Sequence, residues 1–572
     1  MRKWWIHALV LPAFLGASAA LLLPPVGWNL THRLISLCNP DPITFLWFLA
    51  WWPFALAHGL HPLVCRYIWA PVGVNLAWTT CIPSIALLLA PITARWGPFV
   101  SYNIAAILSP ALSAWACYLL CHALTRRVFP SIFGGWVYGF SSFEFRQLLL
   151  HMHLYVTFIP PLLVLAYLSL LRGRLRAQHF VIWTSLLLAF LFGISIEVFA
   201  TTVAFGLTLL LLEWLLVVVT KRDDSTRGAK AAQQSDRKRA IGLVLAALVL
   251  SLIAVAPLLL VMFSHRYPHG GFWSQGAYSV DAANLFIPTR ITWLGGALLK
   301  PLWRTFAGNM TEEGAYLGIP LLLMIVLFIR RYGLSVRGRL LILAGAALLL
   351  AALGPQLRIF GQKLPVPLPW FFIGRLPLLD KALPCRLMLY VTLTIALMGA
   401  IWLAESPAPA RWKFSLAALA VLFLLPNTPA RLWSAKFPTP RFFATTLYRR
   451  YIQPDQNVLI LPFGYHGWSM LWQQQTGFYF RMVDGWVGPY KPPPFDQSAV
   501  IRAFMGHRLP ANYPALLKRF VGSTRIRAIV IAHPRDHRLR RLVAPLRIRP
   551  DHVGGILLYR LPRSTHRDRH RN

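Results

Sequence analysis

Apolar residues run in long, nearly uninterrupted stretches along the first three quarters of the chain. Several windows exceed the roughly 18 apolar residues that a helix needs to cross a bilayer. The stretches consistent with spans are residues 5–24, 100–122, 130–145, 150–171, 179–194, 197–220, 240–263, 315–330, 340–355, 386–404 and 412–427. The pattern predicts an all-α polytopic transmembrane bundle of about 11 spans, occupying residues 1–429.

Two further apolar stretches, residues 43–59 and 79–96, are short and contain central prolines. Counting both as crossings gives thirteen spans. Thirteen is odd, as eleven is, so each terminus would stay on its predicted side of the membrane and this alternative stays open. Trp47, Trp51 and Trp52 are of a type enriched at membrane interfaces, which favours interfacial or re-entrant helices. Both stretches then lie in a large first outer loop, residues 25–99.

The pattern changes after residue 430. Short β-branched runs at 457–463, 526–533 and 554–561 are bounded by turn residues and predict strands. Residues 498–508 and 513–521 have the spacing of amphipathic helices. We therefore expect a small C-terminal α/β extramembrane domain, residues 430–572. Its aromatic stretch 468–490 suits sugar stacking and equally suits packing onto the membrane part.

Basic residues gather in short loops between the spans. The clusters are residues 1–3, 124–127, 172–179, 221–239 and 330–339. Basic loops stay in the cytoplasm, so we expect a cytoplasmic N-terminus and, with an odd number of spans, an extracytoplasmic C-terminal domain. The remaining outer loops are then about 264–313 and 356–385.

The net charge of +39 accompanies a chain that is 57% hydrophobic. Many of the basic residues lie beside apolar spans, where they meet anionic lipid headgroups, and residues 564–572 form a basic, solvated tail. This distribution favours membrane lipids over nucleic acid as a partner. Six cysteines without CxxC spacing indicate neither a disulfide framework nor a zinc cluster. Phosphate-loop, dinucleotide-binding, HExxH and GxSxG motifs are missing from the sequence, which disfavours the enzyme classes that use them.

Acidic residues are scarce. Before residue 221 the sequence contains only Asp41, Glu144, Glu197 and Glu213. Acids near or within a membrane are costly and are functional candidates for that reason. The charge pattern places Asp41, Glu144 and Glu197 on the outer side. We expect Glu197 to cap its helix and Glu213 to be structural.

Asp41 lies between Pro40 and Pro42, which we expect to fix the backbone and keep the aspartate out of a helix. A turn or helix N-cap aspartate is the alternative interpretation. Glu144 either acts chemically or pairs with Arg146. His151 and His153 cannot face the same way on a helix, so a shared metal there is disfavoured, whereas extended structure would place them on one face.

Arginine can bind a phosphate through charge-assisted hydrogen bonds. Arg386 lies just ahead of the span 386–404 in a predicted outer loop, together with Arg375 and Lys381. A phosphate clamp and ordinary contact with lipid headgroups both remain open for Arg386, and headgroup contact is favoured for the others.

These segments resemble the GT-C superfamily of polytopic glycosyltransferases, which take sugar from a polyprenyl-phosphate or polyprenyl-diphosphate carrier on the outer membrane face. The resemblance covers most of residues 1–430, loosely, and the tail less securely. It rests on NPDP (39–42), WFLAWWPFALAHG (47–59), YIWAPVGVNLAW (67–78), residues 101–127, GFSSFEFRQLLLHMHLY (139–155), EGAYLGIPLLL (313–323) and LPLLDKALPCRL (376–387).

The resemblance implies residue roles. Asp41 would be the catalytic base or metal-binding acid of the first loop, and Glu144 the second-loop acid. Arg146, His151 and His153 would be carrier or acceptor contacts, and Arg386 would bind the carrier phosphate. A divalent cation such as Mg or Mn, held by Asp41 and Glu144, is left open because the first loop has a single aspartate rather than a DxD pair.

The expected activity is transfer of sugar from a polyprenyl-phosphate-linked donor to a glycan, lipid or protein acceptor at the bacterial inner membrane. Asp41 would deprotonate the acceptor hydroxyl, which displaces the lipid phosphate with inversion at the anomeric carbon. A transporter or flippase for a lipid-linked saccharide is one alternative, although no internal repeat is visible in the sequence. A non-catalytic envelope scaffold is another.

Overall fold

The computed structural model describes residues 4–219, 227–264, 273–376 and 379–562, and these fall into two compact units. The helical unit comprises Met1–Leu37, Tyr102–Pro257 and His269–Ala435. The mixed unit comprises Cys38–Ser101, Leu258–Pro268 and Lys436–Asn572. The mixed unit thus combines most of the predicted first outer loop with the C-terminal segment. Separate domains at 1–429 and 430–572 stay a prediction, and the basic tail 564–572 lies outside the described residues.

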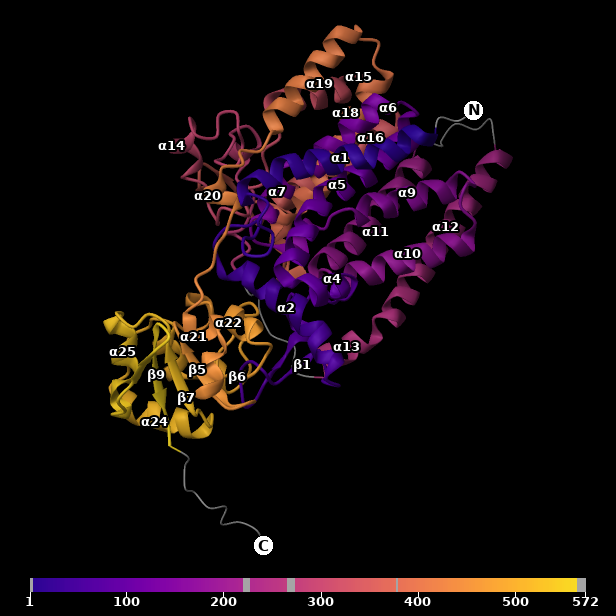
Figure 1. Cartoon of the computed structure of the whole chain (residues 1–572). Helices are drawn as coiled ribbons and strands as arrows, with labels where there is room; N and C mark the ends of the chain where they lie inside the picture. Colours follow the sequence, from indigo (N-terminus) through magenta and orange to yellow (C-terminus); the bar gives the residue numbers. More distant parts are fainter. Residues whose placement is uncertain (1–3, 220–226, 265–272, 377–378, 563–572) are drawn as a thin grey trace. The chain divides into compact units, whose positions relative to one another are not determined.

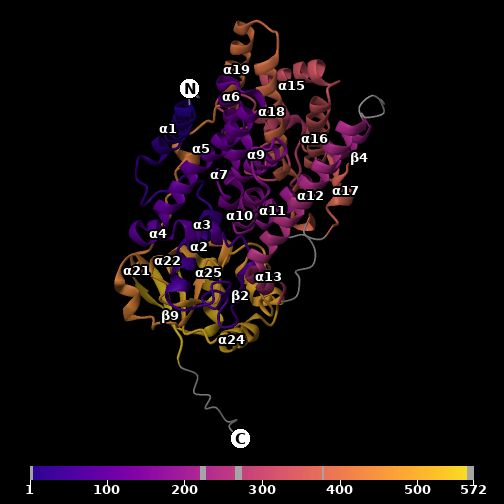
Figure 2. The same cartoon turned by 90° about the vertical axis from the view of Figure 1, so that its right-hand side faces the viewer.

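The helical unit is built from helices that run beside one another (Figures 1 and 2). Its longest helices are α1 (Trp4–Val26), α5 (Pro98–Thr125), α11 (Ile196–Val219), α12 (Arg227–Ala254) and α18 (Met388–Glu405). Shorter helices between them are α6 (Val128–Gly139), α7 (Ser142–Leu148), α8 (Met152–Tyr155), α9 (Ile159–Leu171), α10 (Ala177–Phe192), α15 (Ile319–Tyr332), α16 (Val336–Ala352) and α19 (Ala410–Leu424).

Among the described residues, five helical segments are long and apolar enough to cross a membrane, and a sixth is a pair of helices bent by 65°. The five are Ile6–Val26, Pro98–Thr125, Met152–Leu171, Ile196–Leu216 and Pro384–Glu405, and the bent pair is Arg237–Ala254 with Ala256–Phe263. These segments indicate an integral membrane protein. All eleven predicted stretches overlap helices, but α6, α15, α16 and α19 are 12 to 17 residues long, so the count of about 11 spans is not confirmed.

Helix α18 is the most buried of the candidate spans, with 94% of its apolar window inside the protein. It packs against α6, α15 and α16. Glycine makes the packing of α6 close, because a Cβ on Gly139 would lie 2.4 Å from the backbone nitrogen of Ala114 in α5. A Cβ on Gly134 would lie 3.2 Å from the carbonyl oxygen of Ala396 in α18. The glycines of α6 therefore let this short helix fit between two long ones.

Three of the predicted basic loops meet at one end of the helical unit. Nη1 of Arg172 donates to the carbonyl of Ala123 (2.6 Å), and Nη2 of Arg337 donates to the carbonyl of Leu124 (3.1 Å). The loops after α5, after α9 and before α16 therefore lie together. This grouping is what the positive-inside rule requires of loops on a single side. That this end faces the cytoplasm remains a prediction.

The mixed unit contains a five-stranded sheet in the order β6-β5-β7-β9-β8 (Figure 1). The strands are β5 (Asn457–Leu461), β6 (Arg481–Met482), β7 (Ala528–Ile531), β8 (Asp551–Val553) and β9 (Ile556–Arg560). β5 is parallel to β6 and β7, and β9 is antiparallel to β7 and β8. The surrounding helices are α21 (Arg441–Ala444), α22 (Ser469–Gln475), α23 (Ala499–Phe504), α24 (Tyr513–Ser523) and α25 (His537–Val543).

The small sheet region near the C-terminus is confirmed. The three predicted strand runs contain β5, β7 and β9. The predicted helical piece 498–508 contains α23, and the piece 513–521 covers all but the last two residues of α24. β6 and β8 escaped prediction because strands of two and three residues carry no alternating pattern.

The mixed unit also holds helix α2 (Pro40–Ala57), followed by the hairpin β1 (Val64–Cys65) and β2 (Val74–Asn75) and by α3 (Pro83–Leu88) and α4 (Ala90–Trp96). The proline stretches 43–59 and 79–96 are thus helical, as expected. Their tryptophans are not interfacial, however. Trp47 and Trp51 are at most 1% exposed, and the Trp47 indole donates to Oε1 of Gln473 at 2.8 Å. These indoles fill the core of the mixed unit, so the interfacial explanation for them is wrong.

Candidate functional site

Asp41 lies in the first turn of α2, and this corrects the expectation that its flanking prolines exclude it from a helix. Pro40 is the first helical residue, where a missing N–H costs nothing. Asn39 is the N-cap, and its side-chain oxygen accepts from the backbone N–H of Asp41 at 3.0 Å. Asp41 is therefore not the cap either. Its half-buried carboxylate is left to interact with side chains.

Two tail loops of the mixed unit contact this first turn. Nε1 of Trp486 donates to Oδ1 of Asp41 at 3.0 Å, and the Trp486 carbonyl accepts from Oγ1 of Thr44 at 2.8 Å. Nδ2 of Asn39 donates to the Tyr465 hydroxyl at 3.3 Å. The rings of Tyr465 and Trp486 lie 4.8 Å apart between centroids. The predicted first-loop acid is thus held by aromatic residues from the C-terminal part of the chain.

Asp484 belongs to the same loop as Trp486 and is fully buried. It follows β6, while Gly464 follows β5, and parallel strands end at the same edge of a sheet. Oδ2 of Asp484 accepts from Oγ of Ser469 (2.7 Å) and from the N–H of Gly464 (3.4 Å). Burial raises the pKa of Asp484 to about 7, because loss of water disfavours the charged form.

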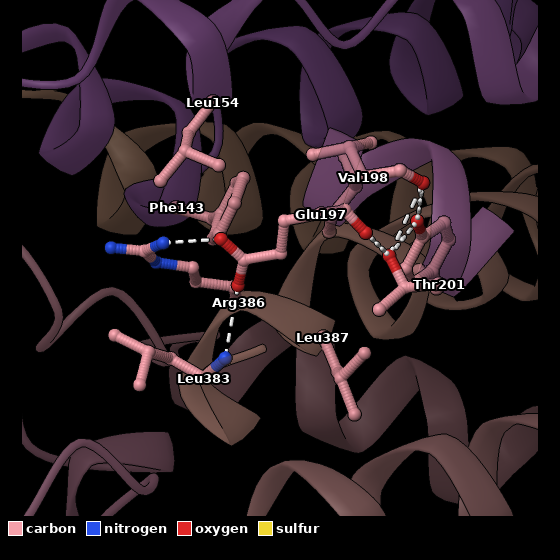
Figure 3. Close-up of a pocket in the computed structure, with 10 residues that line it drawn as sticks. Phe143, Leu154, Glu197, Val198, Thr201, Leu383, Arg386 and Leu387 are labelled. Atoms are coloured by element: carbon pink, nitrogen blue, oxygen red, sulfur yellow. Dashed lines mark hydrogen bonds and ion pairs between the residues drawn. The ribbon is translucent and has the colours of Figure 1, made fainter. Parts of the chain in front are cut away.

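The helical unit contains a second, separate group of charged side chains. Arg386 immediately precedes α18, and its guanidinium forms ion pairs with Glu197, at the start of α11, and with Glu312. Nε and Nη2 of Arg386 donate to Oε1 of Glu312 at 3.1 and 2.7 Å. Figure 3 shows Glu197 between the Arg386 guanidinium and the backbone N–H of Leu383, which donates to it at 2.9 Å.

Glu312 was not singled out from the sequence, although it belongs to a predicted outer loop. Burial alone would raise its pKa, but the Arg386 guanidinium holds the pKa of Glu312 low, at about 2. Glu312 and Glu313 are adjacent acids in a chain with few acids, and this scarcity is the sequence signal that could have identified them. Both acids precede α15, just as Arg386 precedes α18.

Glu144 and Arg146 lie on α7 but do not pair with each other in the way the alternative interpretation proposed. The Glu144 carboxylate accepts from the hydroxyls of Ser109 and Thr157, each at 2.9 Å. Arg146 pairs with Glu313 at 3.4 Å and also donates to Thr289 and to the carbonyl of Met310. Burial lowers the pKa of Arg146 to about 10. Glu144 and Arg146 are two residues apart on a helix, so their side chains point in different directions.

His151 connects α7 to the charged group. Its Nδ1 lies 2.7 Å from Oε1 of Gln147 and 3.9 Å from Oε1 of Glu312. His153, in α8, is buried, and its ring centroid lies 5.9 Å from that of His151. The structure therefore brings together Arg386, Glu197 and His151 from the set discussed above. Glu144 and Arg146 face other partners, and Asp41 belongs to the mixed unit.

A small pocket opens beside Glu197 and Arg386 (Figure 3). The rest of its lining includes Phe143, Leu154, Thr201 and Tyr390. It has room for about one water molecule. The Tyr390 hydroxyl is within hydrogen-bond distance of the hydroxyls of Thr201 (2.8 Å) and Thr202 (2.9 Å). The walls are mostly apolar, and the charged residues that line the pocket are Glu197 and Arg386.

Comparison with known proteins gives structural matches alone. No family model matches the sequence, and no curated protein matches it. The chain is similar to the oligosaccharyltransferase AglB of Archaeoglobus fulgidus, with a TM-score of 0.52 and 11% identity over 92% of this chain and 70% of that chain. A structure of AglB with an inhibitory peptide and a dolichol-phosphate gives a TM-score of 0.51, again at 11% identity, over 93% and 70%.

The chain is also similar to the arabinofuranosyltransferase AftD from Mycobacteria. The TM-score is 0.57 and the identity 14%, over 93% of this chain and 35% of that chain. AglB and AftD are both GT-C glycosyltransferases. The shared feature is the fold, since the identities are low.

A further AglB structure was solved in complex with Zn and sulfate, which suggests a divalent cation among such proteins. The described residues of this chain offer no group of three or more His, Cys, Asp or Glu side chains that could hold a metal ion. Both oxygens of Glu144 accept from hydroxyls, and Oδ1 of Asp41 accepts from an indole. The residues described do not fit a Mg or Mn centre, and no step below passes through a metal.

Proposed function

We propose that this chain, whose fold is that of the GT-C glycosyltransferases, transfers sugar from a polyprenyl-phosphate-linked donor to an envelope acceptor. The fold match over more than nine tenths of the chain supports the reaction class. The observation that carries the proposal is the half-buried Asp41 carboxylate, presented at the start of α2 and oriented by Trp486.

Asp41 acts as the general base. One carboxylate oxygen accepts from the Trp486 indole, which fixes the orientation of the carboxylate without neutralising it. The other oxygen takes the proton of the acceptor hydroxyl as that oxygen attacks the anomeric carbon. The bond from the anomeric carbon to the phosphate oxygen breaks, and the lipid phosphate leaves with the bonding electrons. Direct displacement inverts the anomeric configuration.

The predicted role of Arg386 at the donor phosphate meets a specific constraint. In this structure two carboxylates already neutralise its guanidinium. A phosphate that binds Arg386 therefore competes with Glu197 and Glu312 for the positive charge of the guanidinium. AglB has been solved with dolichol-phosphate, which is the class of carrier that the proposal requires.

Glu144 as the second acid, and Arg146, His151 and His153 as carrier or acceptor contacts, remain part of the proposal. All four side chains are buried, and Glu144, Arg146 and His151 interact with other groups of the protein. The proposed setting is the bacterial inner membrane, with the N-terminus in the cytoplasm and the mixed unit on the outer face. The acceptor is a glycan, a lipid or a protein.

The test is transfer of labelled sugar from polyprenyl-linked donors in proteoliposomes. Asp41→Asn keeps the size of the side chain and removes the base, so we expect a loss of about 10²- to 10⁴-fold in rate. The matched control is Asp455→Asn, which removes an exposed aspartate of the same unit and should leave transfer unchanged.

Equal transfer by wild type and a folded Asp41→Asn variant would exclude Asp41 as the base while keeping the enzyme class. Wild-type protein that moves lipid-linked saccharide across the bilayer without transferring sugar would favour the flippase instead. Neither activity across a broad donor panel would favour the scaffold.

A further inference from the structure

The first turn of α2 is held at three points by the tail loops 463–467 and 483–487. Tyr465, from the first loop, accepts from Asn39. Trp486, from the second, bonds Asp41 with its indole and Thr44 with its carbonyl. The position of the Asp41 carboxylate therefore depends on how the two loops are fixed relative to each other.

Asp484 is the side chain that joins these loops. It belongs to loop 483–487, and its Oδ2 accepts from the N–H of Gly464 in loop 463–467 and from Ser469 at the start of α22. Its own carbonyl accepts from the N–H of Trp69 at 3.2 Å. Oδ1 is buried and has no hydrogen-bond partner among the described residues. A carboxyl that is enclosed in this way connects backbone segments rather than contacting solvent.

We propose that Asp484 is a positioning residue for Asp41, because its buried carboxyl ties together the two loops that bind the Asn39-Pro40-Asp41 turn. The consequence for catalysis rests on the proposed function above. The link between the two loops through Asp484 does not rest on the proposed function, since it concerns contacts within the mixed unit alone.

The charge of Asp484 sets the strength of the tie. The buried position favours the neutral carboxyl, whereas opening of the loops returns the carboxyl to water, where the ionised form is favoured. The groups facing the carboxyl are the Ser469 hydroxyl, the Gly464 N–H and the backbone of β5 at Ile460, and none of these described groups titrates near neutrality. Because burial raises the pKa of Asp484 to about 7, ionisation favours the open loops, and the tie weakens as the pH rises towards neutrality.

Hydrogen exchange of the full-length protein in detergent, followed by mass spectrometry, tests the tie. Asp484→Ala removes both bonds, and we expect about tenfold faster exchange in residues 463–467, 483–487 and 38–44. Asp484→Asn keeps the volume and an acceptor oxygen, so it also tests the tie if the alanine variant fails to fold. After correction for intrinsic rates, exchange in the wild-type loops should become faster as the pH rises towards about 7, and this step should vanish in Asp484→Asn. Asp455→Asn is the control and should match wild type.

The proposal would be overturned if Asp484→Ala left the exchange of either loop unchanged, or if the pH step persisted in Asp484→Asn. Where wild type transfers sugar, Asp484→Asn should lower kcat with little change in KM and flatten the pH profile near 7. Absence of transfer in wild type counts against the proposed function, while the exchange result still decides the role of Asp484.

Discussion

Asp41 and Trp486 illustrate what a single hydrogen bond can contribute at the proposed site. The indole N–H donates to one carboxylate oxygen and so orients the carboxylate, whose other oxygen is the proposed proton acceptor. We expect Trp486→Phe to retain the ring and lower kcat about fivefold, which corresponds to the loss of one ordinary hydrogen bond. Steady-state transfer assays measure this.

Trp468→Phe is the comparison for that experiment. Trp468 is also in the tail and packs against Phe437, with ring centroids 5.2 Å apart. The Trp468→Phe variant should have the kcat of the wild type. Equal loss in both variants would assign the effect to aromatic packing in the tail rather than to the bond with Asp41.

Asp484 should make stability depend on pH. Below about pH 3.8 the carboxyl is protonated in both the folded and the unfolded chain. Between that value and about pH 7 the unfolded chain has lost the proton while the folded chain keeps it, so the free energy of unfolding falls as the pH rises. Above about 7 the loss is complete.

Asp484→Asn removes this titration. We expect the unfolding temperature of the wild type to decrease more than that of the variant between about pH 5 and about pH 8. Thermal unfolding in detergent provides the measurement. Parallel curves for the two proteins would show that Asp484 ionises normally.

Sequence reasoning found Asp41 because acids are scarce, and this signal is visible without a structure. It could not find Trp486 as the partner, since the two residues are 445 positions apart. It also assigned the wrong local conformation to Asp41. A proline at the first helical position is compatible with a helix, and Asn39, two residues before Asp41, supplies the cap.

At the scale of elements, the ion pairs of Arg386 join the starts of α11 and α18 to the segment before α15. Removing the central arginine would leave the buried carboxylate of Glu312 and the partly buried carboxylate of Glu197 without their counter-charge. We expect Arg386→Met to lower the free energy of unfolding by about 3–5 kcal/mol. Thermal unfolding in detergent, with and without Glu197→Gln and Glu312→Gln, measures it.

The triple variant separates structure from function. Neutral glutamines no longer need the arginine, so the triple variant should recover most of the lost stability. Recovered stability together with lost transfer would assign Arg386 to the donor phosphate. Recovery of both stability and transfer would make it purely structural.

The number of spans could not be read from apolar stretches. A window of apolar residues looks the same whether a helix crosses lipid or lies inside the protein. The candidate spans in α1 and α18 have the same mean hydropathy, 2.1, yet 28% of one window and 94% of the other are buried. Short helices such as α6 are stabilised by packing against neighbouring helices, which a window of apolar residues does not reveal.

At the scale of the whole molecule, the sequence predicted where helices and strands form better than it predicted which distant segments pack together. Helices in the first three quarters and a small sheet in the last quarter follow from local patterns. The composition of the mixed unit does not, because Cys38–Ser101 and Lys436–Asn572 carry no local signal of each other. Buried Trp47 and its partner Gln473 are 426 positions apart.

The make-up of the mixed unit also has a consequence for biosynthesis. Its first segment leaves the ribosome early, whereas its sheet is complete only once β9, at Ile556–Arg560, has been made. At roughly 5–20 residues per second, the tryptophans of α2 wait for tens of seconds before their partners exist. During that interval they are a natural target for a chaperone on the side of the membrane where this segment emerges, and a nascent chain stalled at residue 435 should be captured there.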